Sequence, residues 1–188
     1  MSRRFEARFA AVGGQGVILA GDILAEAAAN FEGLNAVQSP TYTAQVRGGP
    51  TKTDVIIDDE EILFPRATKI DFFLSLAQRS YNRFAYNLKP GCIILIDPNL
   101  VHTYDDKNYQ VFKVPLIELT KVQLGRMVFT SAVALGAMTG LTKVIPVESM
   151  LGAIRKKVPK GTEEINIRAF NIGMQAVEEM AHSCRIFA

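Results

Sequence analysis

Residues 11–20 read Ala11-Val12-Gly13-Gly14-Gln15-Gly16-Val17-Ile18-Leu19-Ala20 and join an apolar segment to an alanine-rich one through three glycines. The residues before the glycines are typical of a buried β-strand, and those after them favour an α-helix. The first N–H groups of a helix lack partners within the helix and attract anions, and glycine lets another group approach them closely. The segment therefore predicts a strand, a loop open to an anionic group, and a helix.

Strand and helix patterns continue to alternate along the chain. Strands are predicted over residues 4–12, 34–39, 51–57, 71–76, 92–97 and 109–114. Helices are predicted over residues 17–30, 79–88, 117–123, 125–139, 147–157 and 162–180. This alternation indicates a largely parallel sheet with helices on both faces. Because no repeat or linker interrupts it, we expect a single α/β domain over residues 1–188, Rossmann-like in architecture.

The composition is that of an ordinary globular protein. Hydrophobic residues make up 48% of the chain, and 21 basic against 19 acidic side chains leave a net charge of +2. Because the positive and negative charges nearly cancel, there is no electrostatic reason to expect nucleic acid or a membrane surface as a partner. With no signal peptide at the start and no apolar run long enough to span a bilayer, the predicted location is the cytoplasm.

The glycine loop lacks the features of a dinucleotide-binding fingerprint. Gly14-Gln15-Gly16 opens like GxGxxG, but Leu19 stands where the third glycine allows close packing of helix on strand. The next strand ends in Val37-Gln38-Ser39, without the acidic residue that holds a ribose. A free-standing nucleotide-binding enzyme remains an alternative of a different class, and titration of the chain with NAD or ATP would distinguish it.

The cysteine and histidine residues of this sequence do not form a recognisable metal-binding or iron–sulfur motif. The two cysteines, Cys92 and Cys184, are too few for a four-thiolate cluster, and His102 and His182 have no partners at metal-ligand spacing. Cys92 begins the apolar run 92–96, so we expect it to be a small core residue. We therefore predict no catalytic and no metal-ligating residue in this chain.

Several motifs follow one another in a specific order. They are Gly13-Gly14-Gln15-Gly16-Val17, Gln38-Ser39-Pro40-Thr41-Tyr42, Arg47-Gly48-Gly49 before Thr53-Asp54-Val55-Ile56-Ile57, and the later segments 88–97, 127–140 and 166–170. In this order they resemble the gamma subunit of 2-oxoacid:acceptor oxidoreductases, over nearly the whole chain. The similarity is greatest to the 2-oxoglutarate branch, with the pyruvate and branched-chain oxoacid branches close behind. The smaller subunit of indolepyruvate oxidoreductase is a further alternative.

The resemblance implies a division of labour among subunits. Such complexes decarboxylate a 2-oxoacid, transfer the acyl group to coenzyme A and pass electrons to ferredoxin or flavodoxin. Thiamine diphosphate and magnesium are expected on the alpha and beta subunits, and iron–sulfur clusters on beta or a small delta subunit. This chain is then an accessory subunit, a docking domain without a cofactor of its own, and it is expected to form a homodimer when isolated.

Two loops are the candidate site. The candidate residues are Gly13, Gly14, Gln15, Gly16, Arg47, Gly48 and Gly49, with Thr41 and Tyr42 as weaker candidates. We expect the loops to meet at the carboxyl edge of the sheet, where Arg47 holds a phosphate of coenzyme A and Gln15 supplies an amide. Alternatively, Arg47 bridges to a carboxylate of a partner subunit, the glycines serve only backbone geometry, and Thr41 and Tyr42 form a surface turn or interface.

The segment Met127–Met138 is apolar almost all round. A helix of this kind is buried on more than one side. The burying surface is either the core of this domain or a partner subunit.

Overall fold

The computed structural model describes residues 4–41 and 48–186, with side chains up to residue 180. Its strands form a six-stranded sheet in the order β2-β3-β1-β4-β5-β6. The strands are β1 (Phe5–Val12), β2 (Asn35–Thr41), β3 (Pro50–Asp58), β4 (Ile70–Ser75), β5 (Leu88–Ile96) and β6 (Gln110–Lys113).

Strand β3 runs against the direction of the other described strands. It pairs antiparallel with both β1 and β2, whereas the pairings β1–β4, β4–β5 and β5–β6 are parallel. The reversal follows from the length of the connection, because β2 ends at Thr41 and β3 begins at Pro50. This connection is shorter than the dozen or so residues that a parallel crossover needs. The predicted α/β domain with a largely parallel sheet is therefore confirmed, with one reversed strand.

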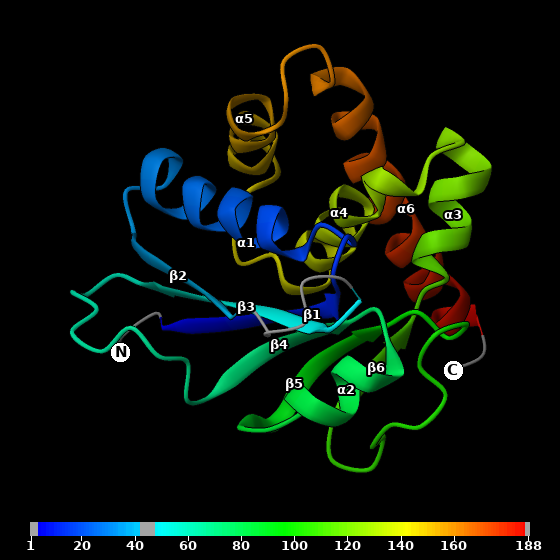
Figure 1. The fold of residues 1–188 in the computed structure, drawn as a ribbon, viewed down its shortest axis with the longest axis horizontal. Coiled ribbons are helices and arrows are strands. Elements are labelled where there is room, and N and C mark those ends of the chain that lie inside the picture. Colours follow the sequence, from blue (N-terminus) through cyan, green and yellow to red (C-terminus); the bar gives the residue numbers. More distant parts are fainter. Residues whose placement is uncertain (1–3, 42–47, 187–188) are drawn as a thin grey trace.

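Helices lie on both faces of the sheet, but unequally (Figure 1). One face is covered by α1 (Val17–Glu26), α3 (Leu116–Leu124), α4 (Thr130–Thr142), α5 (Val147–Lys157) and α6 (Glu163–Ile186). On the other face, only α2 (Gln78–Phe84) contributes to the described apolar core, together with loop residues. The short turns η1 (Ala27–Phe31) and η2 (Met127–Phe129) extend α1 and precede α4.

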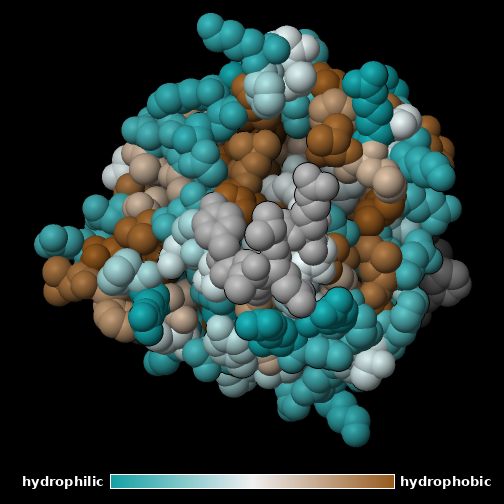
Figure 2. Space-filling model, in the orientation of Figure 1, coloured by the Kyte–Doolittle hydropathy of each residue, from teal (hydrophilic) through white to brown (hydrophobic). Residues whose placement is uncertain are grey.

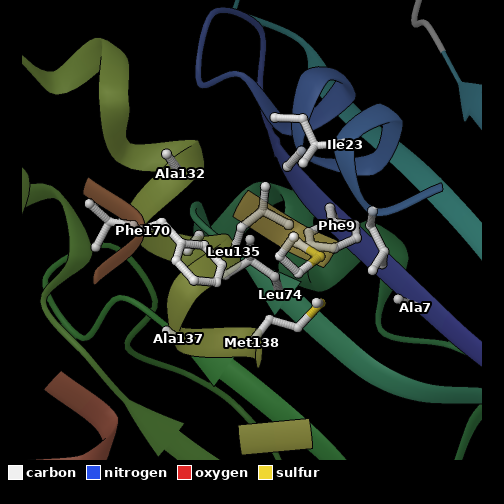
Figure 3. Packing of buried hydrophobic residues seen from close by; sticks show 14 of the residues in the cluster. Ala7, Phe9, Ile23, Leu74, Ala132, Leu135, Ala137, Met138 and Phe170 are labelled. Atoms are coloured by element: carbon white, nitrogen blue, oxygen red, sulfur yellow. The ribbon is translucent and has the colours of Figure 1, made fainter. Parts of the chain in front are cut away.

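The larger core lies between the sheet and the helices of the crowded face. Phe9 of β1, Leu74 of β4, Leu135 and Met138 of α4, and Phe170 of α6 pack together there (Figure 3). Residues 131–139 of α4 are all buried within this chain, so burial on more than one side is confirmed and the domain core accounts for it. The predicted helix 125–139 is wrong at its start, because Met127 and Val128 form η2 and remain 59% and 68% exposed.

The α4–α6 contact is close enough to require glycine on both helices. A Cβ atom added at Gly136 of α4 would lie 1.8 Å from the Phe170 carbonyl oxygen. One added at Gly173 of α6 would lie 1.9 Å from the Val133 carbonyl oxygen. The two helix backbones therefore touch directly, which is how α4 comes to be covered on its far side.

Other predicted boundaries differ from the structure as well, and α6 continues to Ile186 beyond the predicted helix end at residue 180. The predicted helix 17–30 changes to a π-helical turn at Ala27, and the predicted helix 79–88 ends at Phe84. Strand β5 begins at Leu88, so residues 89–91, whose Lys-Pro-Gly pattern predicts a break, lie within a strand. The pairing of β5 with β4 is irregular at this point, which is where a strand tolerates proline.

Candidate functional site

The glycine loop joins β1 to α1 and is closed by the side chain of Gln15. Its Oε1 atom accepts a hydrogen bond from the Val12 N–H at 2.9 Å, and its Nε2 atom donates to the Leu76 carbonyl at 3.3 Å. The Gln15 amide is thus engaged at both ends by the protein itself. Its observed role is to position the loop between two strand ends.

Gly14 and Gly16 adopt left-handed backbone conformations, with φ of 98° and 75°. Gly16 is the N-cap of α1, and a Cβ atom there would lie 2.9 Å from the Ser131 Oγ atom of α4. Both the backbone conformation and the close approach of α4 therefore require glycine at position 16. This contact also ties the start of α1 to the buried helix behind it.

The second glycine pair lies beside the first loop. The Gly13 N–H donates to the Gly49 carbonyl at 3.1 Å, and Gly48 is exposed with φ of 75°. Since Val12 pairs with Pro50, this junction is at the carboxyl end of β1, the edge where we expected the loops to meet. Arg47 and Tyr42 lie outside the described residues.

Thr41 belongs to a different surface. It ends β2 opposite Lys52 of β3 and lines a pocket on the sheet face that carries α2. The glycine loop opens on the opposite face, so the structure does not bring Thr41 together with Gly13–Gly16.

An open groove of about 730 Å³ runs along the glycine loop and the first turn of α1. Besides residues 12–19, it is lined by Asp22, Gln38, Pro40 and Thr51. Gln38 Nε2 donates to the Ile18 carbonyl at 2.8 Å, which fastens β2 to the start of α1. Asp22 and Gln38 are groove residues that the sequence patterns did not predict. For Gln38, the available signal was a polar residue on the helix-facing side of β2.

Asp22 is the acidic group of this groove, and it is paired. Lys157 of α5 lies 2.9 Å from its carboxylate, and this pairing raises the pKa of the lysine. The ion pair offsets the negative charge that would otherwise face an anion at the start of α1.

Within the described residues, neither a cluster of metal-binding side chains nor a membrane-spanning helix is present. No group of three or more His, Cys, Asp or Glu side chains gathers there at metal-binding distances. None of the helices in those ranges combines the length and apolar character needed to cross a bilayer.

Cys92 is a buried core residue, as predicted. Burial, and secondarily the nearby Asp71 carboxylate, raises the pKa of its thiol to about 12. The thiolate is the nucleophile, so we expect iodoacetamide at pH 8 to label Cys92 only after denaturation. Peptide mass spectrometry of native and urea-treated protein checks this, and labelling of native Cys92 to the denatured extent would contradict it.

Comparison with known proteins places this geometry in a family. The family model for pyruvate ferredoxin/flavodoxin oxidoreductase matches residues 6–176. The 2-oxoglutarate synthase subunit KorC of Methanocaldococcus jannaschii is 38% identical over 94% of this chain and 96% of its own length. The pyruvate synthase subunit PorC of Methanothermobacter marburgensis is 29% identical over 95% of this chain and 98% of its own length.

Solved structures show the same fold. The gamma subunit of a keto/oxoacid ferredoxin oxidoreductase from Geobacter sulfurreducens PCA matches with a TM-score of 0.84 and 39% identity, over 92% of this chain and 95% of that one. A 2-oxoglutarate:ferredoxin oxidoreductase from Magnetococcus marinus, solved with 2-oxoglutarate, coenzyme A and succinyl-CoA, has a TM-score of 0.83 at 24% identity. The matched region spans 94% of this chain and 31% of that larger chain, which shows that the two share a fold over this region.

The fold of this chain, a largely parallel sheet with helices on both faces, is that of the gamma subunit of a keto/oxoacid ferredoxin oxidoreductase. The chain belongs to the pyruvate ferredoxin/flavodoxin oxidoreductase family. The resemblance found in the sequence is confirmed, and the chain is a subunit of an enzyme of the 2-oxoacid:acceptor oxidoreductase class.

Proposed function

We propose that this chain is the gamma subunit of a 2-oxoglutarate-specific complex. Such a complex converts 2-oxoglutarate and coenzyme A to the acyl-CoA and CO2, and passes two electrons to ferredoxin or flavodoxin. The supporting observation is the 38% identity to a 2-oxoglutarate synthase subunit over nearly both full lengths, against 29% to a pyruvate synthase subunit. The expected location is the cytoplasm.

The chemistry of this complex is assigned to the partner subunits. We place thiamine diphosphate and magnesium on alpha and beta, and the iron–sulfur clusters on beta or delta. The residues of this chain do not fit a cluster, because four thiolates are needed and the chain has two cysteines, of which Cys92 is buried with a raised pKa.

We propose that the glycine groove helps to receive coenzyme A. The open start of α1 at Gly16 offers unpaired N–H groups to a phosphate, and the Arg47 guanidinium supplies a positive charge next to Gly48 and Gly49. Gln15 acts as a positioning residue, since its amide already bonds the Val12 N–H and the Leu76 carbonyl.

Docking on alpha and beta is proposed close to this groove. Val122 of α3 and Met127 and Val128 of η2 are exposed apolar side chains, at 74%, 59% and 68%. Turn η2 leads directly into α4, whose Ser131 lies against Gly16, so the apolar surface begins near the glycine loop. Exposed apolar residues beside a functional groove are typical of an interface.

Anaerobic purification through a tag on this chain tests the function. We expect alpha and beta subunits to be recovered and dye reduction to require coenzyme A and 2-oxoglutarate, with pyruvate and branched-chain oxoacids much less active. Recovery of the chain without those partners would contradict the proposal, and preference for pyruvate or a branched-chain oxoacid would reassign the branch.

Within the purified complex, Arg47→Ala is expected to raise the apparent KM for coenzyme A about tenfold with little change in kcat, because a charge-assisted contact made on binding is lost. Steady-state kinetics with varied coenzyme A measure this. Arg155→Ala, an exposed arginine on α5, is the matched control. An unchanged KM in Arg47→Ala would instead favour a structural or partner-contact role for Arg47.

A further inference from the structure

A second pocket lies on the sheet face that carries α2, away from the glycine groove. Side chains alternate between the faces of a strand, so Arg8 of β1 and Lys52 and Asp54 of β3 point to this face together. The pocket has a volume of about 710 Å³, within the range of small-molecule sites.

The pocket floor is a buried ion cluster. Arg8, 1% exposed, donates from Nε and Nη2 to the two oxygens of Asp54 at 2.7 and 3.0 Å. Its Nη1 donates to the carbonyls of Phe84 and Tyr86 at 3.0 and 2.8 Å. Lys52 also bonds Asp54 and is itself 9% exposed. One carboxylate therefore compensates two cations, and the floor keeps a net positive charge.

Two further cations stand over this floor. Arg66 of the β3–β4 loop and Arg83 of α2 line the pocket and are exposed. Across residues 4–41 and 48–180, neither forms an ion pair. Four cations thus face the pocket against the single carboxylate of its lining, Asp54. The uncompensated charge favours a ligand with two or three negative charges.

The rest of the lining offers neutral donors and aromatic rings. The hydroxyls of Ser39, Thr41 and Thr68 can donate to phosphate oxygens. Phe64 and Tyr86 also line the pocket and are 57% and 46% exposed, and the Tyr86 ring packs on the Arg8 guanidinium, with 4.3 Å between Arg8 Cζ and the ring centroid. Apolar residues appear in brown at the left edge of the surface in Figure 2, where the loop between β3 and β4 lies in Figure 1.

We propose that this pocket binds a phosphorylated small molecule with a planar ring, of the nucleotide class. Its phosphates lie among Lys52, Arg66 and Arg83, and its ring stacks on Phe64. The inference goes beyond the proposed function, because this pocket is on the other face of the sheet from the groove assigned to coenzyme A.

Calorimetric titration of the full chain with ADP and with pyrophosphate tests the phosphate part. In Arg66→Ala/Arg83→Ala, the Kd of both probes is expected to rise at least about tenfold, since charge-assisted contacts are lost. Lys69→Ala/Arg79→Ala is the matched control: it removes the same charge from the same loop and helix, at exposed positions that do not line the pocket. Its Kd values should stay within about twofold of the unchanged chain.

Phe64→Leu tests the ring contact. It should weaken ADP binding about tenfold and leave pyrophosphate binding unchanged, because stacking concerns only the ring. If the arginine variant and the control variant lost the same affinity for the two probes, the binding would depend on general surface charge, and the proposal would be overturned. The absence of ADP binding at millimolar concentration would also overturn it. If ADP does not bind and Arg66→Ala/Arg83→Ala no longer assembles with alpha and beta, the surface belongs to an acidic partner protein instead.

Discussion

Replacing Gly136 with alanine is expected to destabilise the chain by about 3 kcal/mol or more, although alanine is the better helix former. In an exposed helix the same change stabilises by about 0.5–1 kcal/mol. Here the added methyl would lie 1.8 Å from the Phe170 carbonyl oxygen, and a backbone atom cannot rotate away. Helices α4 and α6 must therefore separate, which opens the core around Leu135 and Phe170.

Urea unfolding and thermal melting measure this loss. For a domain of this size, 3 kcal/mol corresponds to a fall in Tm of roughly 10 °C. Gly173→Ala should behave alike, since its methyl would meet the Val133 carbonyl at 1.9 Å. Gly140→Ala is the graded control on the same helix, because its nearest contact is the end of the Val177 side chain. Equal stability of Gly136→Ala and Gly140→Ala would contradict direct backbone contact.

Replacing Asp54 with alanine is expected to cost about 3–5 kcal/mol, the range for removing one partner from a buried ion pair. The substitution leaves Arg8 and Lys52 buried at 1% and 9% exposure without their shared carboxylate. Arg8 cannot lose its proton, so its charge stays in the sheet.

Lys52→Met is the matched comparison for that prediction. Asp54 would keep both hydrogen bonds from Arg8, so the expected cost in unfolding free energy is about 1 kcal/mol. Urea unfolding of the two variants at neutral pH measures the two losses of unfolding free energy and hence their ratio. A loss for Lys52→Met as large as that for Asp54→Ala would show that the ammonium, rather than Arg8, holds the carboxylate.

Local patterns predicted the elements well because each depends on neighbouring residues. The strand before Gly13, the glycine loop and the helix from Val17 are where periodicity placed them. The π-helical turn at Ala27 and the early start of β5 at Leu88 depend on packing against other parts of the chain, which periodicity does not contain.

The site was predicted only in part, for a similar reason. Glycine spacing identified the junction of Gly13 with Gly49, but the internal use of the Gln15 amide depends on Leu76, distant in sequence. Alternation of Arg8 with Ala7 and Phe9 suggests one solvated strand face, yet Arg8 is buried. Its partner Asp54 is 46 residues away, so the charged floor of the second pocket is visible only once β1 and β3 pair.

The antiparallel strands β2 and β3 contribute to both the glycine groove and the second pocket. The glycine groove is lined by Gln38, Pro40 and Thr51 of these strands. The second pocket is lined by the residues next to them in sequence, Ser39, Thr41 and Lys52. A slip of one residue in the register of either strand would exchange which side chains face the groove and which face the pocket. An insertion in either of these strands would therefore change the lining of both cavities at once, which makes the strand register a constraint on both sides of the sheet.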